Sequence, residues 1–153
     1  MKVSTRFSDS IHILAFIDIY HGIIPLTSNN IARSIETSPV VVRRLMSALN
    51  KAGLINTVHG AADPELAKKP AEISLYDIFL AIEGDAQLFS IDKQTNPQCI
   101  VGGNIQETLN EYYQQAENAA KAKLAGTSLQ DIIDTIRVKQ AQKDAIKRKK
   151  DTK

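Results

Sequence analysis

The stretch SPVVVRRLMSALNK, residues 38–51, decides the fold. A serine hydroxyl can accept a hydrogen bond from a free N–H at a helix start, and proline at the first helical position loses no hydrogen bond. We therefore predict a helix that begins at Ser38-Pro39 and ends near Lys51, before Gly53. Its apolar positions, three or four residues apart, predict one buried face: Val42, Leu45, Met46 and Leu49.

The opposite face of this helix has no acidic residue. It carries Val40, Arg43, Arg44, Ser47 and Asn50. The arginine fork suits both guanine edges and phosphates, although a pair of arginines on a solvated helix face is the alternative. A shorter helix, capped by Thr27 or Ser28 and ending near Ile35, is predicted just before it. Two short helices, the second capped and basic, are typical of a helix-turn-helix.

The surrounding sequence predicts a mainly α fold with a small two-stranded wing. A first helix begins at Ser4 or Ser8, ends at Tyr20, and is apolar on more than one face, so we expect it to be buried on several sides. Residues 54–58 and 65–67 are predicted as the two strands of the wing. Ser74 caps a helix over 75–83. Residues 1–83 thus form a winged helix-turn-helix domain.

The second half of the chain predicts a long C-terminal dimerisation helix. Residues 84–103 are predicted as an effector or sensor loop and 104–138 as dimerisation helices. Residues 139–153 are predicted as a basic tail that is either a frayed helix or disordered. An apolar stripe on the long helix needs a partner surface, and a second copy of the chain would supply one. The predicted dimer interface is Ile105, Leu109, Tyr112, Tyr113 and Ala116.

Composition limits the function. The 153 residues are 43% hydrophobic and 24% charged, which is ordinary for a globular protein, and a net charge of +2 does not by itself indicate a polyanion partner. The lone cysteine, Cys99, excludes an intramolecular disulfide and a thiolate-rich metal site and favours a reducing cytoplasm. Residues 11–24 are too short and polar to span a membrane. We find no nucleophile–base pair, phosphate-binding loop or metal set, so we expect no enzyme and no metal.

Four features together resemble one known family. They are Arg6, the SPVVVRRL segment at 38–45, Lys51-Ala-Gly-Leu-Ile, and Pro70-x-Glu-Ile-Ser-Leu. The chain is similar, over nearly its whole length to about Ile136, to the Rrf-type bacterial regulators. This group includes the iron-sulfur cluster assembly regulator, the nitric-oxide-sensitive repressor and the cysteine-metabolism repressor. The resemblance implies a winged helix-turn-helix dimer that binds a palindromic DNA operator.

The resemblance also implies site residues. The recognition helix would present Ser38, Val40, Val41, Arg43 and Arg44, the preceding helix would present Asn29 and Asn30, and Arg6, Lys51 and His59 complete the predicted DNA-binding set. Two features depart from the family pattern. Cluster-binding members have three cysteines in the loop before the long helix, so we expect no iron-sulfur cluster here. The wing reads His59-Gly-Ala-Ala-Asp-Pro instead of Arg-Gly followed by glycines, which argues against minor-groove insertion by an arginine.

The sequence therefore predicts a cytoplasmic, homodimeric DNA-binding repressor. The alternative is a thiol- or ligand-responsive dimeric interaction module with weakened DNA binding, in which an unknown small-molecule effector or oxidant acts at residues 88–104. Cys99 is a possible thiol sensor, because a loop thiol near a helix N-terminus can have a lowered pKa. A small apolar loop residue is the other interpretation of Cys99.

Overall fold

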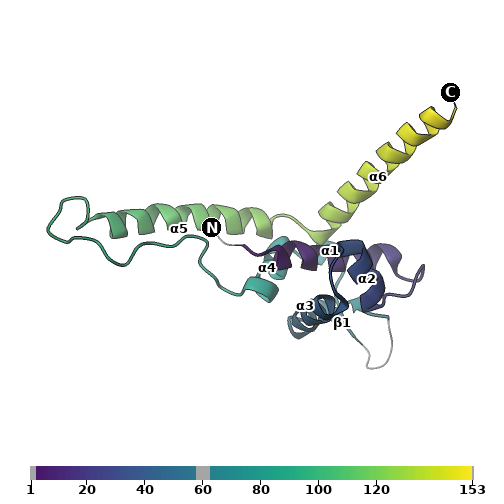
Figure 1. The fold of residues 1–153 in the computed structure, drawn as a ribbon, viewed down its shortest axis with the longest axis horizontal. Coiled ribbons are helices and arrows are strands. Elements are labelled where there is room, and N and C mark those ends of the chain that lie inside the picture. The colour runs from purple at the N-terminus through teal and green to yellow at the C-terminus, as the bar shows by residue number, and fades with distance from the viewer. Residues whose placement is uncertain (1–2, 58–62, 153) are drawn as a thin grey trace.

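The computed structural model describes residues 3–57 and 63–152. Its helices and strands, in chain order, are α1 (Thr5–Tyr20), α2 (Ser28–Ile35), α3 (Pro39–Lys51), β1 (Ile55–Asn56), β2 (Glu65–Leu66), the 3-10 helix η1 (Pro70–Glu72), α4 (Leu75–Glu83), α5 (Ile105–Ala125) and α6 (Leu129–Asp151). Figure 1 shows α1 to α4 and the strands gathered in one unit, from which α5 and α6 extend in different directions. The predicted fold class, mainly α with a two-stranded wing, is confirmed.

Side-chain caps set where the helices begin. The Thr27 hydroxyl accepts a hydrogen bond from the Asn30 N–H (3.1 Å), and the Ser38 hydroxyl accepts one from the Val41 N–H (3.3 Å). Ser74 and Asp77 cap α4 reciprocally, since each side chain accepts from the other residue's N–H. Such caps satisfy N–H groups that have no partner within the helix. The predicted starts of α2, α3 and α4 are therefore confirmed.

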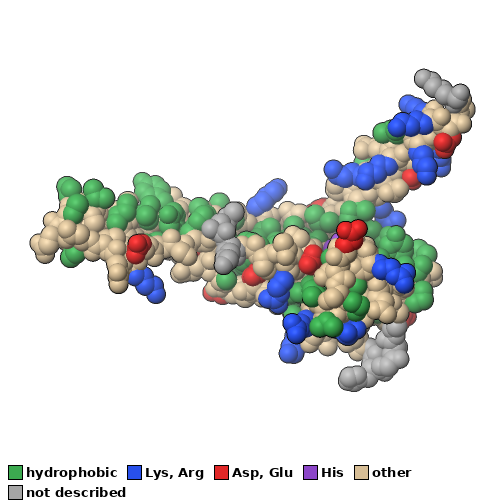
Figure 2. All heavy atoms as spheres, viewed as in Figure 1, with side chains coloured by type: hydrophobic (Ala, Val, Ile, Leu, Met, Phe, Trp, Pro, Cys, Tyr) green, Lys and Arg blue, Asp and Glu red, His purple; other side chains and the backbone are tan. Residues whose placement is uncertain are grey.

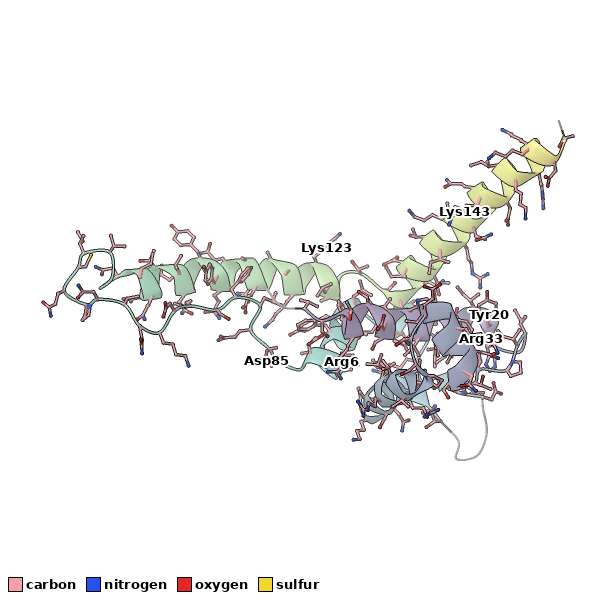
Figure 3. The ribbon with its side chains drawn as sticks, viewed as in Figure 1. Arg6, Tyr20, Arg33, Asp85, Lys123 and Lys143 are labelled. Atoms are coloured by element: carbon pink, nitrogen blue, oxygen red, sulfur yellow. The ribbon has the colours of Figure 1, made fainter. Side chains whose placement is uncertain are left out.

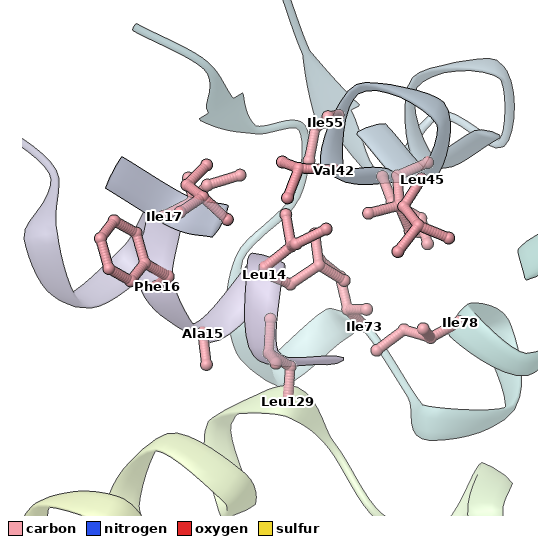
Figure 4. Close-up of a cluster of buried hydrophobic side chains, with 14 of the residues drawn as sticks. Leu14, Ala15, Phe16, Ile17, Val42, Leu45, Ile55, Ile73, Ile78 and Leu129 are labelled. Atoms are coloured by element: carbon pink, nitrogen blue, oxygen red, sulfur yellow. The ribbon is translucent and has the colours of Figure 1, made fainter. Parts of the chain in front are cut away.

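The core lies between α1 and the elements that surround it. Leu14 of α1 is fully buried, as are Val42 of α3 and Ile78 of α4 (Figure 4). Burying a side chain of this size contributes about 1.5–3 kcal/mol. Helix α1 is buried on several sides, as predicted, because α2, α3, α4 and α6 all pack against it.

The wing is short. Ile55 pairs with Leu66 and Asn56 with Glu65 in an antiparallel register, and the Ala67 N–H donates to the Leu54 carbonyl (2.9 Å). Each strand has two residues, fewer than the predicted 54–58 and 65–67. Ile55 is buried, so the wing is attached to the core at its base.

Helix α6 begins inside the first domain. The predicted end of this domain at residue 83 therefore differs from the structure. Leu129 and Ile133 are almost completely buried and belong to the core that α1 shares. The Leu129 N–H donates to the Ile73 carbonyl (2.8 Å), and the Leu75 N–H donates to the Thr127 carbonyl (2.9 Å). The first turns of α6 therefore close the DNA-binding domain and are not part of the dimerisation region predicted over 104–138.

Of the two alternatives predicted for the tail, disorder is wrong for 139–151, which continue α6 as helix. Ser128 and Asp131 cap the start, and Gln140 donates a hydrogen bond to Asp144 one turn on (2.9 Å). Lysine, glutamine, alanine and arginine favour helix, and basic residues in the last turn interact favourably with the helix dipole. Those residues are Arg148, Lys149 and Lys150.

Candidate nucleic-acid interface

The turn between α2 and α3 positions the basic face of α3. Glu36 ends α2 in the left-handed conformation (φ 62°), and its N–H donates to the Ala32 carbonyl. Ser38 then caps α3, whose buried residues Val42, Leu45 and Leu49 hold it against the core. The opposite face is exposed, as predicted: Val40, Arg43, Arg44, Ser47 and Asn50.

Arg43 is held at the junction of the two helices. Its Nη1 donates a hydrogen bond to the hydroxyl of Ser28, the first residue of α2, at 3.2 Å. Arg44 and Lys51 are exposed. Within residues 3–57 and 63–152 the single ion pair joins Lys121 to Asp85, far along the chain from α3. The cations of α3 are therefore available to an external anion.

The surface view supports this arrangement. Lys and Arg side chains gather over the lobe that contains α3, at the lower side of the molecule in Figure 2. Arg6, which is labelled in Figure 3, is exposed in the first turn of α1. Clustered positive charge of this kind is what phosphate binding requires.

Two predicted DNA contacts are placed differently, and a third lies outside the described residues. The Asn30 side-chain amide donates to the Pro25 carbonyl (2.7 Å), so it stabilises the start of α2, whereas Asn29 is exposed. Val41 is half-buried and packs against the core, because its position in α3 turns it away from the basic face. His59 lies outside the described residues.

Helix α5 carries the predicted dimer interface. No residue of α5 is buried within the chain, and Tyr112 remains 63% exposed. Figure 2 shows hydrophobic side chains along the upper side of this helix. The ring of Tyr113, in contrast, stacks on Phe89 of the preceding loop, with centroids 5.1 Å apart. Tyr113 therefore holds the loop on α5. Of the other predicted interface residues, Tyr112 and Ala116 are exposed, whereas Ile105 and Leu109 are half-buried.

The loop after α4 lies along α5. One carboxylate oxygen of Glu117 accepts hydrogen bonds from the Leu88 N–H (2.7 Å) and the Phe89 N–H (3.2 Å). A groove of about 450 Å³ lies between this part of the loop and the helix. Its lining is mostly polar and includes Gln87, Lys93, Gln106, Asn110 and Gln114. The sequence predicted an effector loop here but gave no sign of the Glu117 contact, which joins residues almost thirty positions apart.

Cys99 is exposed near the far end of this loop, just before α5. Hydrogen bonds from the Gly102 and Val101 backbone lower the pKa of the thiol below its ordinary value. The turn is tight, since the Gly103 N–H donates to the Cys99 carbonyl at 2.8 Å. A Cβ on Gly102 would meet the Asn96 backbone, so glycine is needed there. The Cys99 thiol is therefore held in a defined turn.

Comparison with known proteins assigns the family. A family model described as Rrf2, iron-dependent transcriptional regulator, matches residues 3–135. The chain belongs to the Rrf2 family. The candidate HTH-type regulator YwnA of Bacillus subtilis is 36% identical over 132 residues, which are 86% of this chain and 97% of YwnA. The B. subtilis regulator CymR is 26% identical over 133 residues, 86% of this chain and 89% of CymR.

Solved structures agree with the Rrf2 fold. A candidate DNA-binding protein with 36% identity superposes with a TM-score of 0.66, covering 84% of this chain and 98% of the other. The B. subtilis CymR structure has a TM-score of 0.67 at 24% identity, covering 88% and 97%. Rrf2 relatives are transcriptional regulators and not enzymes. None of the helices in the described ranges is both long enough and apolar enough to cross a membrane.

The iron named in the Rrf2 description does not fit the donors of this chain. Iron-sulfur clusters are held mainly by cysteine thiolates, and this chain has Cys99 alone. In the part of the chain that the structure describes, no group of three or more His, Cys, Asp or Glu side chains could hold a metal ion. We therefore assign no step to iron.

Proposed function

We propose that this Rrf2 protein is a cytoplasmic repressor that binds double-stranded DNA as a homodimer on a palindromic operator. The observation that carries the proposal is the capped, exposed basic face of α3 in a chain of the Rrf2 family. Among the described residues, neither Arg43 nor Arg44 has an acidic partner. An α-helix of this size fits the major groove of B-DNA. Repression follows from occupation of a promoter.

The contacts divide into two kinds. Arg43 projects from the first half of α3, where recognition helices contact base edges, and a bidentate arginine–guanine contact discriminates between bases. Arg44, Lys51, Asn29 and Arg6 are exposed around it and supply phosphate contacts. Phosphate contacts give affinity and register but carry no direct sequence information.

The apolar stripe of α5 supports a homodimer. Tyr112 is 63% exposed, and none of the stripe residues is fully buried within the chain. A two-fold pairing of α5 with the same helix of a second copy would bury the stripe. Such a dimer presents two α3 helices and therefore binds two half-sites related by the same symmetry.

Selection of bound duplexes from a random-sequence pool tests DNA recognition, and analytical ultracentrifugation tests the dimer. We expect enrichment of an inverted repeat and a sedimenting mass of two chains. Tyr112→Glu should give monomers, whereas Lys123→Glu changes charge on the same helix and should leave the dimer intact. A pool that stays random after selection would contradict sequence-specific binding, and a monomeric parent chain would contradict the homodimer.

A second candidate function, control of DNA binding by an effector, is favoured by the groove along α5. Its polar lining suits a small molecule that has both hydrogen-bond donors and acceptors. Since the loop is tied to α5 through Glu117, a ligand there would act on the dimer helix. Binding of a small polar metabolite in the groove should raise the thermal unfolding midpoint of the parent chain. The same metabolite should not raise the midpoint of the Asn110→Ala variant. A library in which no compound shifts the midpoint would argue against the groove as an effector site.

A further inference from the structure

The charge of this chain is divided unevenly along its length. Residues 137–153 hold eight of the 19 Lys and Arg residues and two of the 17 Asp and Glu residues, a net charge of +6. Residues 1–136, which include the helix-turn-helix and the whole of the Rrf2 match, therefore have a net charge of −4. The excess positive charge of this chain therefore lies outside its DNA-binding domain, although the proposed partner of that domain is a polyanion.

The second half of α6, residues 137–151, forms what we call the basic arm. It is helical throughout, and every residue in it is exposed. Figure 1 shows it leaving the folded domain as a free rod, with the C-terminus at its tip. The arm contributes nothing to the core, so its sequence is not explained by packing.

The cations of the arm are arranged in a stripe. Lys139, Lys143, Lys147 and Lys150 are separated by four, four and three residues and so project from one side of the helix. At 1.5 Å per residue the stripe is roughly 16 Å long, enough to follow several phosphates along a duplex. Asp144 lies off this stripe and accepts a hydrogen bond from Gln140. In the described part of the chain, no ion pair joins any of these lysines to Asp144 or Asp151.

The position of the arm separates it from the recognition helix. In Figure 1, α3 lies on the lower side of the domain, whereas α6 rises from the opposite side. Lys143, labelled in Figure 3, lies well out along this rod. A duplex seated on α3 does not run along the arm of the same protomer.

We propose that the basic arm is a second, sequence-independent binding surface for duplex DNA, separate from α3. Its lysines contact phosphates of a different stretch of nucleic acid and add affinity without adding specificity. The proposal rests on charge complementarity with the DNA that the proposed function supplies. It does not require that α3 read any particular operator.

The salt dependence of binding to a random-sequence duplex tests the proposal, because the slope of log K against log salt changes by about 0.9 for each phosphate contact. The variant replaces Lys139, Lys143, Lys147 and Lys150 with glutamine, which also favours helix. The control replaces the same four lysines with arginine and keeps the charge. Fluorescence anisotropy is measured from about 50 to 200 mM salt, the range over which such contacts weaken strongly.

We expect the glutamine variant to lose about 3.6 units of slope per protomer, about 0.9 for each of the four lysines, and to bind about tenfold or more weakly at low salt. The arginine control should match the parent. The same factor should be lost when Arg43→Ala is already present, because the two surfaces are separate. If α3 reads no operator, Arg43→Ala changes the affinity for every duplex by the same small factor, but the loss of slope in the glutamine variant remains. That result would refute the proposed function but not the proposal that the basic arm binds duplex DNA.

Two results would overturn the proposal. The first is a glutamine variant that binds duplex like the parent at every salt concentration, which would make the arm a solvated helix end. The second is an unchanged duplex slope together with loss of binding to phosphatidylserine-containing vesicles, which would assign the arm to a lipid surface. Circular dichroism of the full-length variant verifies that α6 is still helical.

Discussion

Replacing Arg43 by alanine tests whether α3 reads bases. The change removes a guanidinium from the exposed face of α3 and the hydrogen bond from its Nη1 to the Ser28 hydroxyl. Because Arg43 is exposed, the stability of the domain should change little, since surface substitutions usually stay within about 0.5 kcal/mol. The effect should therefore appear in DNA binding.

The expected rise in Kd after Arg43→Ala follows from the energy of an arginine–guanine contact. A good bidentate arginine–guanine pair contributes about 1–3 kcal/mol of discrimination, which corresponds to a Kd higher by roughly 5- to 150-fold for each half-site of the selected operator. On a random duplex Arg43 supplies at most one phosphate contact, so the Kd should rise only about two- to threefold. The ratio of the two Kd values is thus the quantity to measure.

The assay is fluorescence anisotropy at one stated salt concentration, with the selected operator and a scrambled duplex of equal length. Ser28→Ala is the matched control, because it removes the hydrogen bond but keeps the Arg43 charge. We expect Ser28→Ala to retain operator preference. Arg44→Ala should weaken both duplexes alike, as expected for a phosphate contact.

Equal losses on operator and scrambled DNA after Arg43→Ala would refute a base-reading role for this residue. Loss of preference in Ser28→Ala as large as that in Arg43→Ala would show that the Ser28–Arg43 hydrogen bond, and not direct readout, sets specificity. Either result would require a different side chain on α3 to read the bases.

Three further predictions concern stability and the loop. Leu129→Ala should lower the free energy of unfolding in urea by about 2–5 kcal/mol, because Leu129 is fully buried. The control Ile136→Ala, at a position that is 42% exposed, should lower it much less. Equal losses would contradict the role of α6 in the core. Burial lowers the pKa of His12 below its ordinary 6.5, against a smaller opposing effect of Asp9. The unfolded chain therefore binds the proton more readily, and stability should fall as the pH drops below 6.5; an unchanged pH dependence in His12→Gln would exclude this cause. Gly102→Ala should disturb the turn around Cys99, raise the pKa of the thiol and slow its alkylation at neutral pH. Gly126→Ala is the control, because a Cβ added there has only ordinary contacts. Equal alkylation rates in the two variants would show that the turn does not activate the thiol.

The sequence by itself predicted those features of the fold that depend on residues only a few positions apart. Ser38 and Pro39 predicted the start of α3, and the three- and four-residue spacing of Val42, Leu45 and Leu49 predicted its buried face. The basic face followed from the same periodicity, because residues on the other side of a buried stripe are exposed. The helix-turn-helix, its caps and its cationic surface are thus properties of local sequence.

Long-range packing decided what the local pattern left open. Leu129 belongs to the core of the first domain, and Tyr113 stacks on Phe89, because contacts between distant segments bury these side chains. Val41 is half-buried against the core for the same reason. Periodicity identifies an apolar side chain that needs a partner, but which surface covers it depends on how the helices pack, and that arrangement exists only once the chain has folded.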